Sequence, residues 1–567
     1  MPVAGLFVAV LLNLGLLWFF HNRYWCPADD GVFAHVAERI LHGEVLHRDV
    51  QEAHPGLVNF INALMLRIFG VDFVSLRYPL VFMTVIEAAI SYRLILPLGV
   101  AAAIAASFVP AAMGLLNFIN PNPHWYSVFF LFLIIATFSW VPAGNRLRLP
   151  LTGLLLGLIM LTRQLSGCLA ALGVFAFLYW ENRQDAPLKK FSAGRILLAV
   201  AAGGLGWYLW KASDGSGYVL IGMWPLSVLG LLLTRGTVED AALQRICIGL
   251  AMGIALAFIP LLGYHAATHS LDWWWRDAVG LALQHLDQPF LSFYKFVDLF
   301  KGGWGLLLHP AGPTDLLNGI FWIVVPLFSL LNGVWLIGTL YRRPPQLRPA
   351  ELALPMLAAF HSVVSLHNQI PIYLFFSIGL SLLGFLKLSL IPARPVVRNW
   401  TVAGVAFLCA VAIYFQGGQS FTRGFGGIVK GVRVPWADAG GRVPRLDLYT
   451  DESFIRTYSQ MIAFIQSNTR PAESIFVFPN NAEVYFLAQR RNPFRFFSAD
   501  LGITDEAEYR KVLQTFQSAP PRCVVFLSAD KRNTVYTLRL LEFIQRRYRF
   551  AKRAGLFEIY VWPQVGR

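Results

Sequence analysis

The sequence is poor in charged residues and in cysteine. Charged residues make up 14% of the 567 residues against 56% hydrophobic residues, and the mean hydropathy is +0.54. This composition excludes an ordinary soluble protein and indicates a polytopic membrane protein. The five cysteines show no CxxC spacing, and the chain also lacks an HExxH motif and a phosphate-binding P-loop. A structural zinc site and ATP-driven transport therefore have no support.

The net charge of +15 does not indicate a nucleic-acid partner. No basic patch has interleaved aromatic residues, and much of the Lys and Arg lies in short loops between apolar runs. Under the positive-inside rule, alternate basic loops such as 181–195 and 341–350 face the cytoplasm. The N-terminus is then cytoplasmic, while 21–78, 265–316 and the chain after 416 face the periplasm or cell exterior of a bacterium.

Apolar runs of about 17 to 25 residues are long enough to cross a bilayer. We expect about thirteen crossings, near 3–20, 79–95, 98–116, 125–142, 149–164, 166–180, 196–211, 217–233, 246–264, 317–340, 352–366, 370–390 and 400–416. The first run has no basic segment before it and no small-residue cleavage site after it, so it is expected to stay as an anchor. The predicted localisation is the bacterial cytoplasmic (inner) membrane.

Three segments outside these runs have their own patterns. In the first periplasmic loop, 21–78, residues 30–42 predict an amphipathic helix lying on the membrane surface, followed by a second interfacial helix. The long loop 265–316 is rich in aromatic residues and is expected to rest at the membrane interface. Residues 417–567 alternate helical and strand patterns, which predicts a soluble α/β domain that supports acceptor access. The remaining module is the transmembrane region 1–416.

Asp29 and Asp30 stand side by side where the first run leaves the membrane. One interpretation is that both cap the helix that follows, because acidic side chains stabilise a helix N-terminus. The other is that a carboxylate here removes the proton of an acceptor hydroxyl or binds a divalent cation. Spacing alone leaves both interpretations open.

The order of motifs resembles bacterial GT-C glycosyltransferases related to protein mannosyltransferases and the aminoarabinose transferase. A first span is followed by "DDGVFAHVAERILHGEVLHRDVQEAHPG" and then by "SLRYP". Later, "LTRQLSG" (161–167) and "VYFLAQRRNPFRF" (484–496) resemble further family segments. The resemblance implies a GT-C-like transmembrane catalytic module.

The resemblance also implies an activity and a set of site residues. It implies a polyprenyl-phosphate-linked sugar as donor, a glycan, lipid or protein as acceptor, inversion at the anomeric carbon, and in some members Mg²⁺ or Mn²⁺. Asp29 matches the expected base and Asp30 the second acidic residue. The chain departs from the family pattern where His54 precedes Pro55 instead of a Lys, and where His47-Arg48-Asp49 replaces an aromatic-Arg-Asp sequence. His54 and Asp49 are nevertheless expected at the substrate.

Further candidates each have a second interpretation. Arg163, followed by Gln164, is expected either to hold the donor phosphate or to reach lipid headgroups. Glu52 and His124 are candidate metal ligands together with Asp30, although such a His is more often an interfacial polar residue. Residues Asn368, Gln369 and Tyr373 are expected to bind sugar hydroxyls or to cap a helix start.

The function predicted from the sequence is an inverting membrane glycosyltransferase acting on the outer side of the membrane. Two alternatives stay open, a transporter or flippase of lipid-linked saccharide and a non-catalytic assembly protein. A transporter would place ionisable residues near the middle of several spans and often contains internal repeats, neither of which the sequence shows.

Overall fold

The computed structural model describes residues 2–184, 192–284, 295–342, 347–390, 395–415, 436–528, 530 and 532–563. These residues form two compact units, each built from separate stretches of chain. The first unit comprises Met1–Phe20, Pro79–Tyr264 and Ala282–Arg433, and the second His21–Tyr78, His265–Leu281 and Val434–Arg567. The boundary predicted at 416/417 lies in 416–435, outside the described residues.

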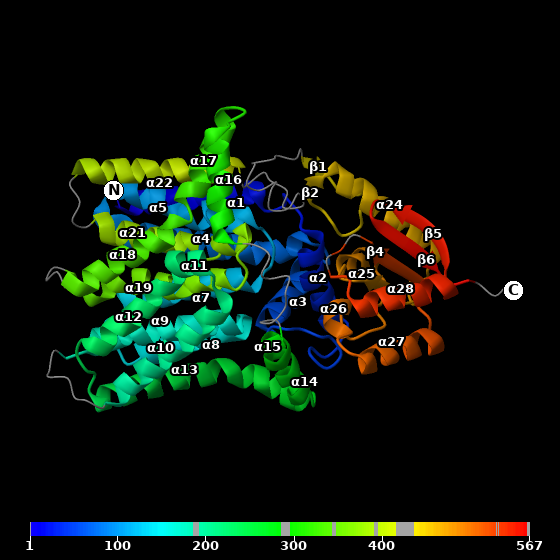
Figure 1. Cartoon of the computed structure of the whole chain (residues 1–567), viewed down its shortest axis with the longest axis horizontal. Helices are drawn as coiled ribbons and strands as arrows, with labels where there is room; N and C mark the ends of the chain where they lie inside the picture. The colour runs from blue at the N-terminus through cyan, green and yellow to red at the C-terminus, as the bar shows by residue number, and fades with distance from the viewer. Residues whose placement is uncertain are drawn as a thin grey trace. The chain divides into compact units, whose positions relative to one another are not determined.

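The described part of the first unit consists of helices joined by loops (Figure 1). Its longer helices are α1 (Pro2–Phe20), α4 (Tyr78–Ile95), α7 (Pro123–Trp140), α8 (Arg148–Thr162), α9 (Gln164–Asn182), α10 (Ala193–Ala212), α12 (Met223–Thr234), α13 (Asp240–Ala267), α16 (Phe296–Leu308), α17 (Pro313–Val324), α18 (Leu327–Arg342), α19 (Ala353–Ser362), α21 (Ile378–Leu390) and α22 (Pro395–Phe415). Short helices connect them, among them α5 (Val100–Ser107), α6 (Val109–Ala112), α11 (Gly215–Gly217), α15 (Ala282–Gln284) and α20 (Pro371–Phe375).

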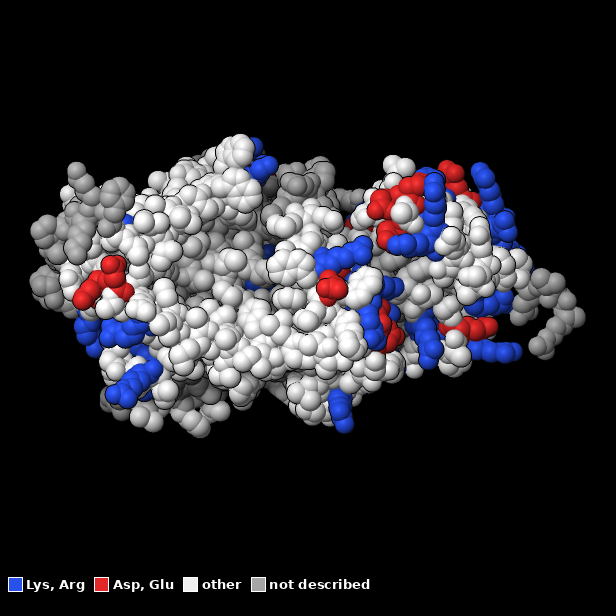
Figure 2. Space-filling view, turned by 90° about the horizontal axis from the view of Figure 1, so that it is seen from below, with Lys and Arg blue, Asp and Glu red and all other residues white. Residues whose placement is uncertain are grey.

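Within the described residues, 11 helical segments are long and apolar enough to cross a membrane. The predicted class of polytopic membrane protein is therefore confirmed. The predicted crossings 149–164 and 370–390 are helical but shorter than a full span, because α8 has 15 residues and Pro371 begins the separate helix α20 before α21. The surface agrees with this assignment: Figure 2 shows a broad face of the helical unit with very few Lys, Arg, Asp or Glu side chains.

The second unit combines helices with two small sheets. Its helices are α2 (Pro27–Leu41), α3 (Leu57–Phe69), α14 (Leu271–Trp275), α24 (Glu452–Asn468), α25 (Glu483–Ala488), α26 (Ala499–Gly502), α27 (Glu506–Ser518) and α28 (Val535–Arg547). Strands β3 (Ile475–Phe478), β4 (Cys523–Leu527), β6 (Phe557–Val561) and β5 (Arg549–Ala554) form one sheet in that order, with only the β3–β4 pair parallel. Strands β1 (Trp436–Asp438) and β2 (Tyr449–Asp451) form an antiparallel pair. The predicted α/β character of this region is confirmed.

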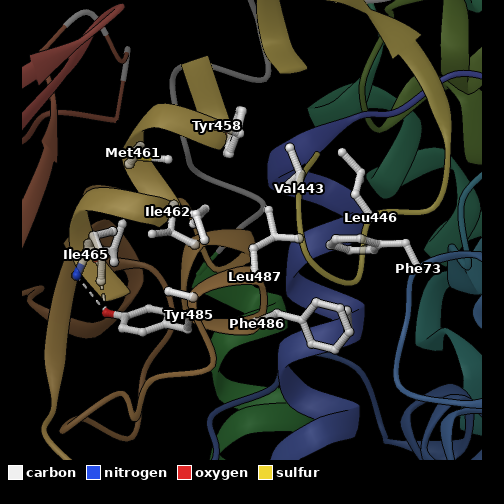
Figure 3. Close-up of a cluster of buried hydrophobic side chains, with 14 of the residues drawn as sticks. Phe73, Val443, Leu446, Tyr458, Met461, Ile462, Ile465, Tyr485, Phe486 and Leu487 are labelled. Carbon is white, nitrogen blue, oxygen red and sulfur yellow. Dashed lines mark hydrogen bonds between the residues drawn. The ribbon is translucent and has the colours of Figure 1, made fainter. Parts of the chain in front are cut away.

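The first loop and the C-terminal residues share one hydrophobic core. Trp25 packs edge-on against Tyr458 at 4.7 Å, and Phe73 lies 4.9 Å from Phe486. Figure 3 shows Phe73 among Val443, Leu446 and Phe486, which come from distant parts of the chain. Residues 21–78 and 436–563 therefore fold as one body.

The apolar face of helix α2, predicted from its amphipathic pattern to rest on a membrane surface, packs inside the second unit. It packs against α25, and His35 stacks on Tyr485 at 4.9 Å. Ala34 and Ala37 are fully buried in the shared core. The spacing of apolar residues in a helix is the same for a bilayer and for a protein core, so the sequence alone did not distinguish them. Helix α3 does keep an exposed apolar face, with Leu64, Ile68 and Phe69 about half-exposed.

Gly31 is the point of closest approach between α2 and the C-terminal residues. A Cβ atom added there would overlap the backbone nitrogen of Glu483 and lie 2.6 Å from its Cα. We expect Gly31→Ala to lower the free energy of unfolding by about 1–3 kcal/mol, because the backbones must separate. Thermal unfolding of the purified protein measures this. Gly280→Ala, where the added Cβ meets nothing within 4 Å, is the control, and equal effects of both changes would contradict the tight contact.

Candidate functional site

The Asp30 side chain has a structural role at the start of α2. Its Oδ2 accepts hydrogen bonds from the backbone N–H of Cys26 at 3.1 Å and from Nη2 of Arg77 at 3.2 Å. The Arg77 side chain is fully buried, and the exposed fraction of Asp30 is 1%. The same guanidinium donates to the backbone oxygens of three neighbouring residues, His21, Arg23 and Tyr24, at 2.9–3.1 Å. Asp30 thus both caps α2 and neutralises a buried cation.

Asp29 is in a different position. It lies in the first turn of α2 and is half-buried, and it forms no ion pair with any described residue. Burial raises the pKa of Asp29, while the charge of Arg532 and a hydrogen bond with the Cys26 thiol act against this rise. Burial raises the pKa of Asp30 to about 6, although Arg77 lowers it. Of the two carboxylates, Asp29 is the one available to a substrate.

The remaining candidates of the first loop all form hydrogen bonds with neighbouring protein groups. Asp49 accepts from Arg48 and from the backbone N–H of Val45. Glu52, which is 3% exposed, accepts from His54 Nδ1 at 2.8 Å and from Asn59 Nδ2 at 3.0 Å. His54 is therefore held by a carboxylate, and its predicted contact with the substrate remains a prediction.

The predicted metal ligands are poorly suited to a cation. Both oxygens of Glu52 and one oxygen of Asp30 accept hydrogen bonds from protein groups. Across the described ranges, no three His, Cys, Asp or Glu side chains lie together as a metal site would require. His124 belongs to the other unit, where its ring stacks on Phe376 at 4.0 Å. Metal dependence of the activity stays a prediction.

Arg163 is a buried cation in the helical unit that forms no ion pair with a described residue. It separates α8 from α9, and its exposed fraction is 7%. Its Nη1 donates to Ser166 Oγ at 3.3 Å, and no described carboxylate pairs with it. The hydroxyls of Tyr208 and Tyr373 lie close enough to interact with its charge. Tyr208, which the sequence did not single out, has a buried hydroxyl with no hydrogen-bond partner among the described residues.

The other candidates of the helical unit differ in how far protein groups already satisfy them. Gln369 donates to Asp214 at 3.1 Å and accepts from the backbone N–H of Phe296, so its amide is already engaged. The buried Oδ1 of Asn368 has no hydrogen-bond partner within the described part of the chain. Tyr373 contacts the rings of His124 and Phe376. Gln164 is the first residue of α9, directly after Arg163.

Two buried clusters of the second unit were missed from the sequence. Asp277 forms an ion pair with Arg495, and Asp277 Oδ2 lies 3.4 Å from His47 Nδ1. These contacts join the first loop, residues 265–281 and residues near 495. Glu483 is fully buried and accepts from the Tyr458 hydroxyl at 2.7 Å and from Asn481 Nδ2 at 2.8 Å. Both clusters depend on contacts between residues far apart in sequence, and no local spacing signals them.

Residues 53–207 match the family model described as dolichyl-phosphate-mannose-protein mannosyltransferase. The match covers less than half of the chain and starts within the first loop. The predicted resemblance to this group of membrane glycosyltransferases is confirmed over that stretch.

Other comparisons give weaker likeness. A probable K⁺/H⁺ antiporter component of Rhizobium meliloti (strain 1021) is 26% identical over 208 residues, which cover 34% of this chain and 36% of that protein. The chain thus spans about a third of the length of this curated relative.

Two solved structures align over nearly the whole chain at low scores. The archaeal oligosaccharyltransferase AglB from Archaeoglobus fulgidus, in complex with an inhibitory peptide and a dolichol-phosphate, has a TM-score of 0.43 and 14% identity, covering 99% of this chain and 74% of that chain. ArnT from Cupriavidus metallidurans bound to undecaprenyl phosphate has a TM-score of 0.39 and 11% identity, covering 100% of this chain and 98% of that chain.

The stability of the second unit is expected to fall as the pH rises between about 4.5 and 7. Burial raises the pKa of Glu483 from 4.5 to about 7, so over this range the folded state retains a proton that the unfolded chain releases. The free energy of unfolding then decreases with rising pH, by about 3 kcal/mol in total. Thermal unfolding at pH 5 and pH 8 should show this loss in the wild type and a smaller loss in Glu483→Gln.

The exposed Glu542 supplies the control for this measurement. Its replacement by Gln removes a carboxylate from the same unit without touching the buried cluster. Glu542→Gln should keep the pH dependence of the wild type. If Glu483→Gln also keeps the pH dependence of the wild type, the Glu483 carboxyl group does not cause the loss of stability at higher pH.

Proposed function

We propose that this protein is a membrane glycosyltransferase that moves a sugar from a polyprenyl-phosphate donor to a hydroxyl group of a cell-envelope acceptor. The observation that carries the proposal is the different environment of two adjacent carboxylates, one tied to Arg77 and one without an ion pair among the described residues. The family match over 53–207 supports the reaction class. The acceptor is a glycan, a lipid or a protein. The proposed orientation places the second unit on the outer side of the bacterial cytoplasmic membrane.

In the proposed step, the acceptor oxygen attacks the anomeric carbon of the sugar. A new C–O bond forms while the bond from that carbon to the phosphate oxygen breaks, and the electron pair leaves with the lipid phosphate. Attack from the face opposite the phosphate inverts the anomeric carbon. The acceptor proton passes to Asp29, and burial raises the pKa of this carboxyl group, which makes it a stronger base than an exposed aspartate.

Arg163 is the proposed contact for the donor phosphate. A buried guanidinium without a carboxylate partner is unfavourable, because the protein has removed its water without supplying an opposite charge. A phosphate would supply that charge through two parallel hydrogen bonds. The Tyr208 hydroxyl, which has no partner among the described residues, is a further donor for it.

Ion transport is the second candidate. The match to an antiporter component favours it, as does Glu87, a buried glutamate within α4 whose exposed fraction is 5%. Intramembrane carboxylates are common in proton pathways. Proton flux into liposomes that is abolished by Glu87→Gln would support this function over sugar transfer.

Asp29→Asn is expected to lower turnover by a factor of roughly 10² or more with folding and donor binding retained. The substitution keeps the shape of the side chain and removes the basic oxygen. Release of polyprenyl phosphate from radiolabelled polyprenyl-phosphate sugars by the purified protein measures this turnover.

Asp30→Asn is the matched variant, because it changes the neighbouring carboxylate in the same way. It should chiefly cost stability, since the buried Arg77 then loses its anionic partner. Normal turnover in Asp29→Asn with none in a folded Asp30→Asn would reverse the roles. Normal turnover in both would remove the basis of the proposed mechanism.

Arg163→Lys should weaken donor binding while expression is retained. Lysine keeps the charge but lacks the planar fork that binds two phosphate oxygens together. The apparent KM for the donor, measured with Arg163→Lys and Arg163→Ala, should rise in both, and more in the alanine variant. An unchanged donor KM in both variants would show that Arg163 does not bind the donor and instead has a structural role or contacts lipid headgroups.

A further inference from the structure

Glu87 carries a buried carboxyl group that the proposed sugar transfer does not use. It lies near the middle of Val74–Leu98, a segment long and apolar enough to cross a membrane, and its exposed fraction is 5%. The backbone oxygen of Glu87 accepts a hydrogen bond from Ser91 Oγ. The carboxyl group itself forms no hydrogen bond or ion pair with a described residue. Because an ionisable group is costly inside an apolar span, such a residue indicates a binding site.

Glu87 lines a cavity within the first unit. Four aromatic side chains and one thioether also line this cavity, and they are Met113, Trp125, Phe132, Phe375 and Phe376. Trp125 and Phe132 are seven residues apart on α7, so they lie on the same face of that helix. Phe375 is the last residue of α20, and Phe376 follows it. Among the described residues that line the cavity, Glu87 alone is ionisable.

The size and lining of the cavity favour a small cation. The cavity has a volume of about 20 Å³. A water molecule needs about 10–15 Å³ of such space, so the cavity suits one group of that size. A primary ammonium group is about as large as a water molecule and carries the charge opposite to that of a carboxylate. Aromatic rings also attract cations through the negative faces of their π-systems.

We propose that this cavity binds a small primary ammonium ion, which exchanges with a proton on Glu87. In the empty cavity the carboxyl group keeps its proton, because a carboxylate without water or a partner is costly. When the cation enters, the proton leaves and the carboxylate pairs with the ammonium group, so the cavity stays neutral. The site does not depend on the proposed sugar transfer. It provides a class of cation for the second candidate function.

Other titratable side chains contact the aromatic lining from outside the cavity. His124 stacks on the Phe376 ring at 4.0 Å, and His361 Nε2 lies 3.2 Å from the Phe376 backbone oxygen. Neither histidine lines the cavity. The proposal therefore assigns the pH dependence of cation binding to Glu87.

Ligand-observed saturation-transfer NMR on the full-length protein in lipid nanodiscs tests the site, with the signals of empty nanodiscs subtracted. The probes are methylammonium, its neutral analogue methanol, and tetramethylammonium, which is too large for the cavity. At pH 8 the wild type should transfer saturation to methylammonium and at least threefold less to the other two probes. The methylammonium signal should fall at pH 6, because protons then compete for the carboxylate.

Three variants locate the binding. Glu87→Gln keeps the shape of the side chain and removes its charge, so it should abolish the methylammonium signal at both pH values. Phe132→Leu keeps an apolar wall but removes one ring, so it should reduce the signal. Glu239→Gln changes an exposed glutamate of the same unit and should leave the signal unchanged.

Equal signals from methylammonium and methanol would overturn the proposal and show that the cavity holds water or a neutral hydroxyl group. Equal signals from methylammonium and tetramethylammonium would overturn it as well, because they would indicate binding outside the cavity. The absence of a methylammonium signal, or a signal that neither pH 6 nor Glu87→Gln lowers, would also contradict the proposed exchange.

Discussion

The buried guanidinium of Arg77 organises the start of the second unit. It donates to the backbone oxygens of His21, Arg23 and Tyr24 and to the Asp30 carboxylate, so it fixes the chain in the interval between α1 and α2. Removing one partner of such a buried pair typically costs 3–5 kcal/mol, because an uncompensated charge is left behind. Asp29 precedes Asp30 by one residue, about 100° around the helix, and so points away from this pair. Because Asp30 forms the ion pair with Arg77, the Asp29 carboxylate remains available for the proposed proton transfer.

Local pattern was enough to predict much of the fold. The apolar runs predicted most spans, and the described residues after 435 contain the mixture of helices and strands that the sequence predicts. Strand β5 was missed because "RFAKRA" carries three basic residues in six positions and has no apolar alternation. The roles within the Asp29–Asp30 pair were not fixed by sequence either, since the deciding partner lies 47 residues away. The motif "SLRYP" contains Arg77, yet nothing in it indicates a buried ion pair.

The shared core changes how the C-terminal residues are understood. They were predicted to form a separate domain that supports acceptor access. Trp25 and Phe73 instead pack into their core, and the 480–483 turn lies against Gly31. Residues of distant origin therefore pack against the start of α2 within one unit. A buried contact of this kind carries no periodic signature, because each partner alone is an ordinary apolar or polar residue. This explains why the sequence placed the α/β elements correctly and did not predict their relation to α2.

The central claim is that Arg77 and Asp30 form a structural pair, which leaves Asp29 without an ion pair among the described residues. Carboxyl ¹³C NMR titration of protein labelled at aspartate tests it most directly, with resonances assigned from Asp29→Asn and Asp30→Asn. The account predicts a pKa of about 6 for Asp30, and on Arg77→Met a further rise for Asp30 with little change at Asp29. An unshifted Asp30, or a response to Arg77→Met that appears at Asp29 instead, would contradict it.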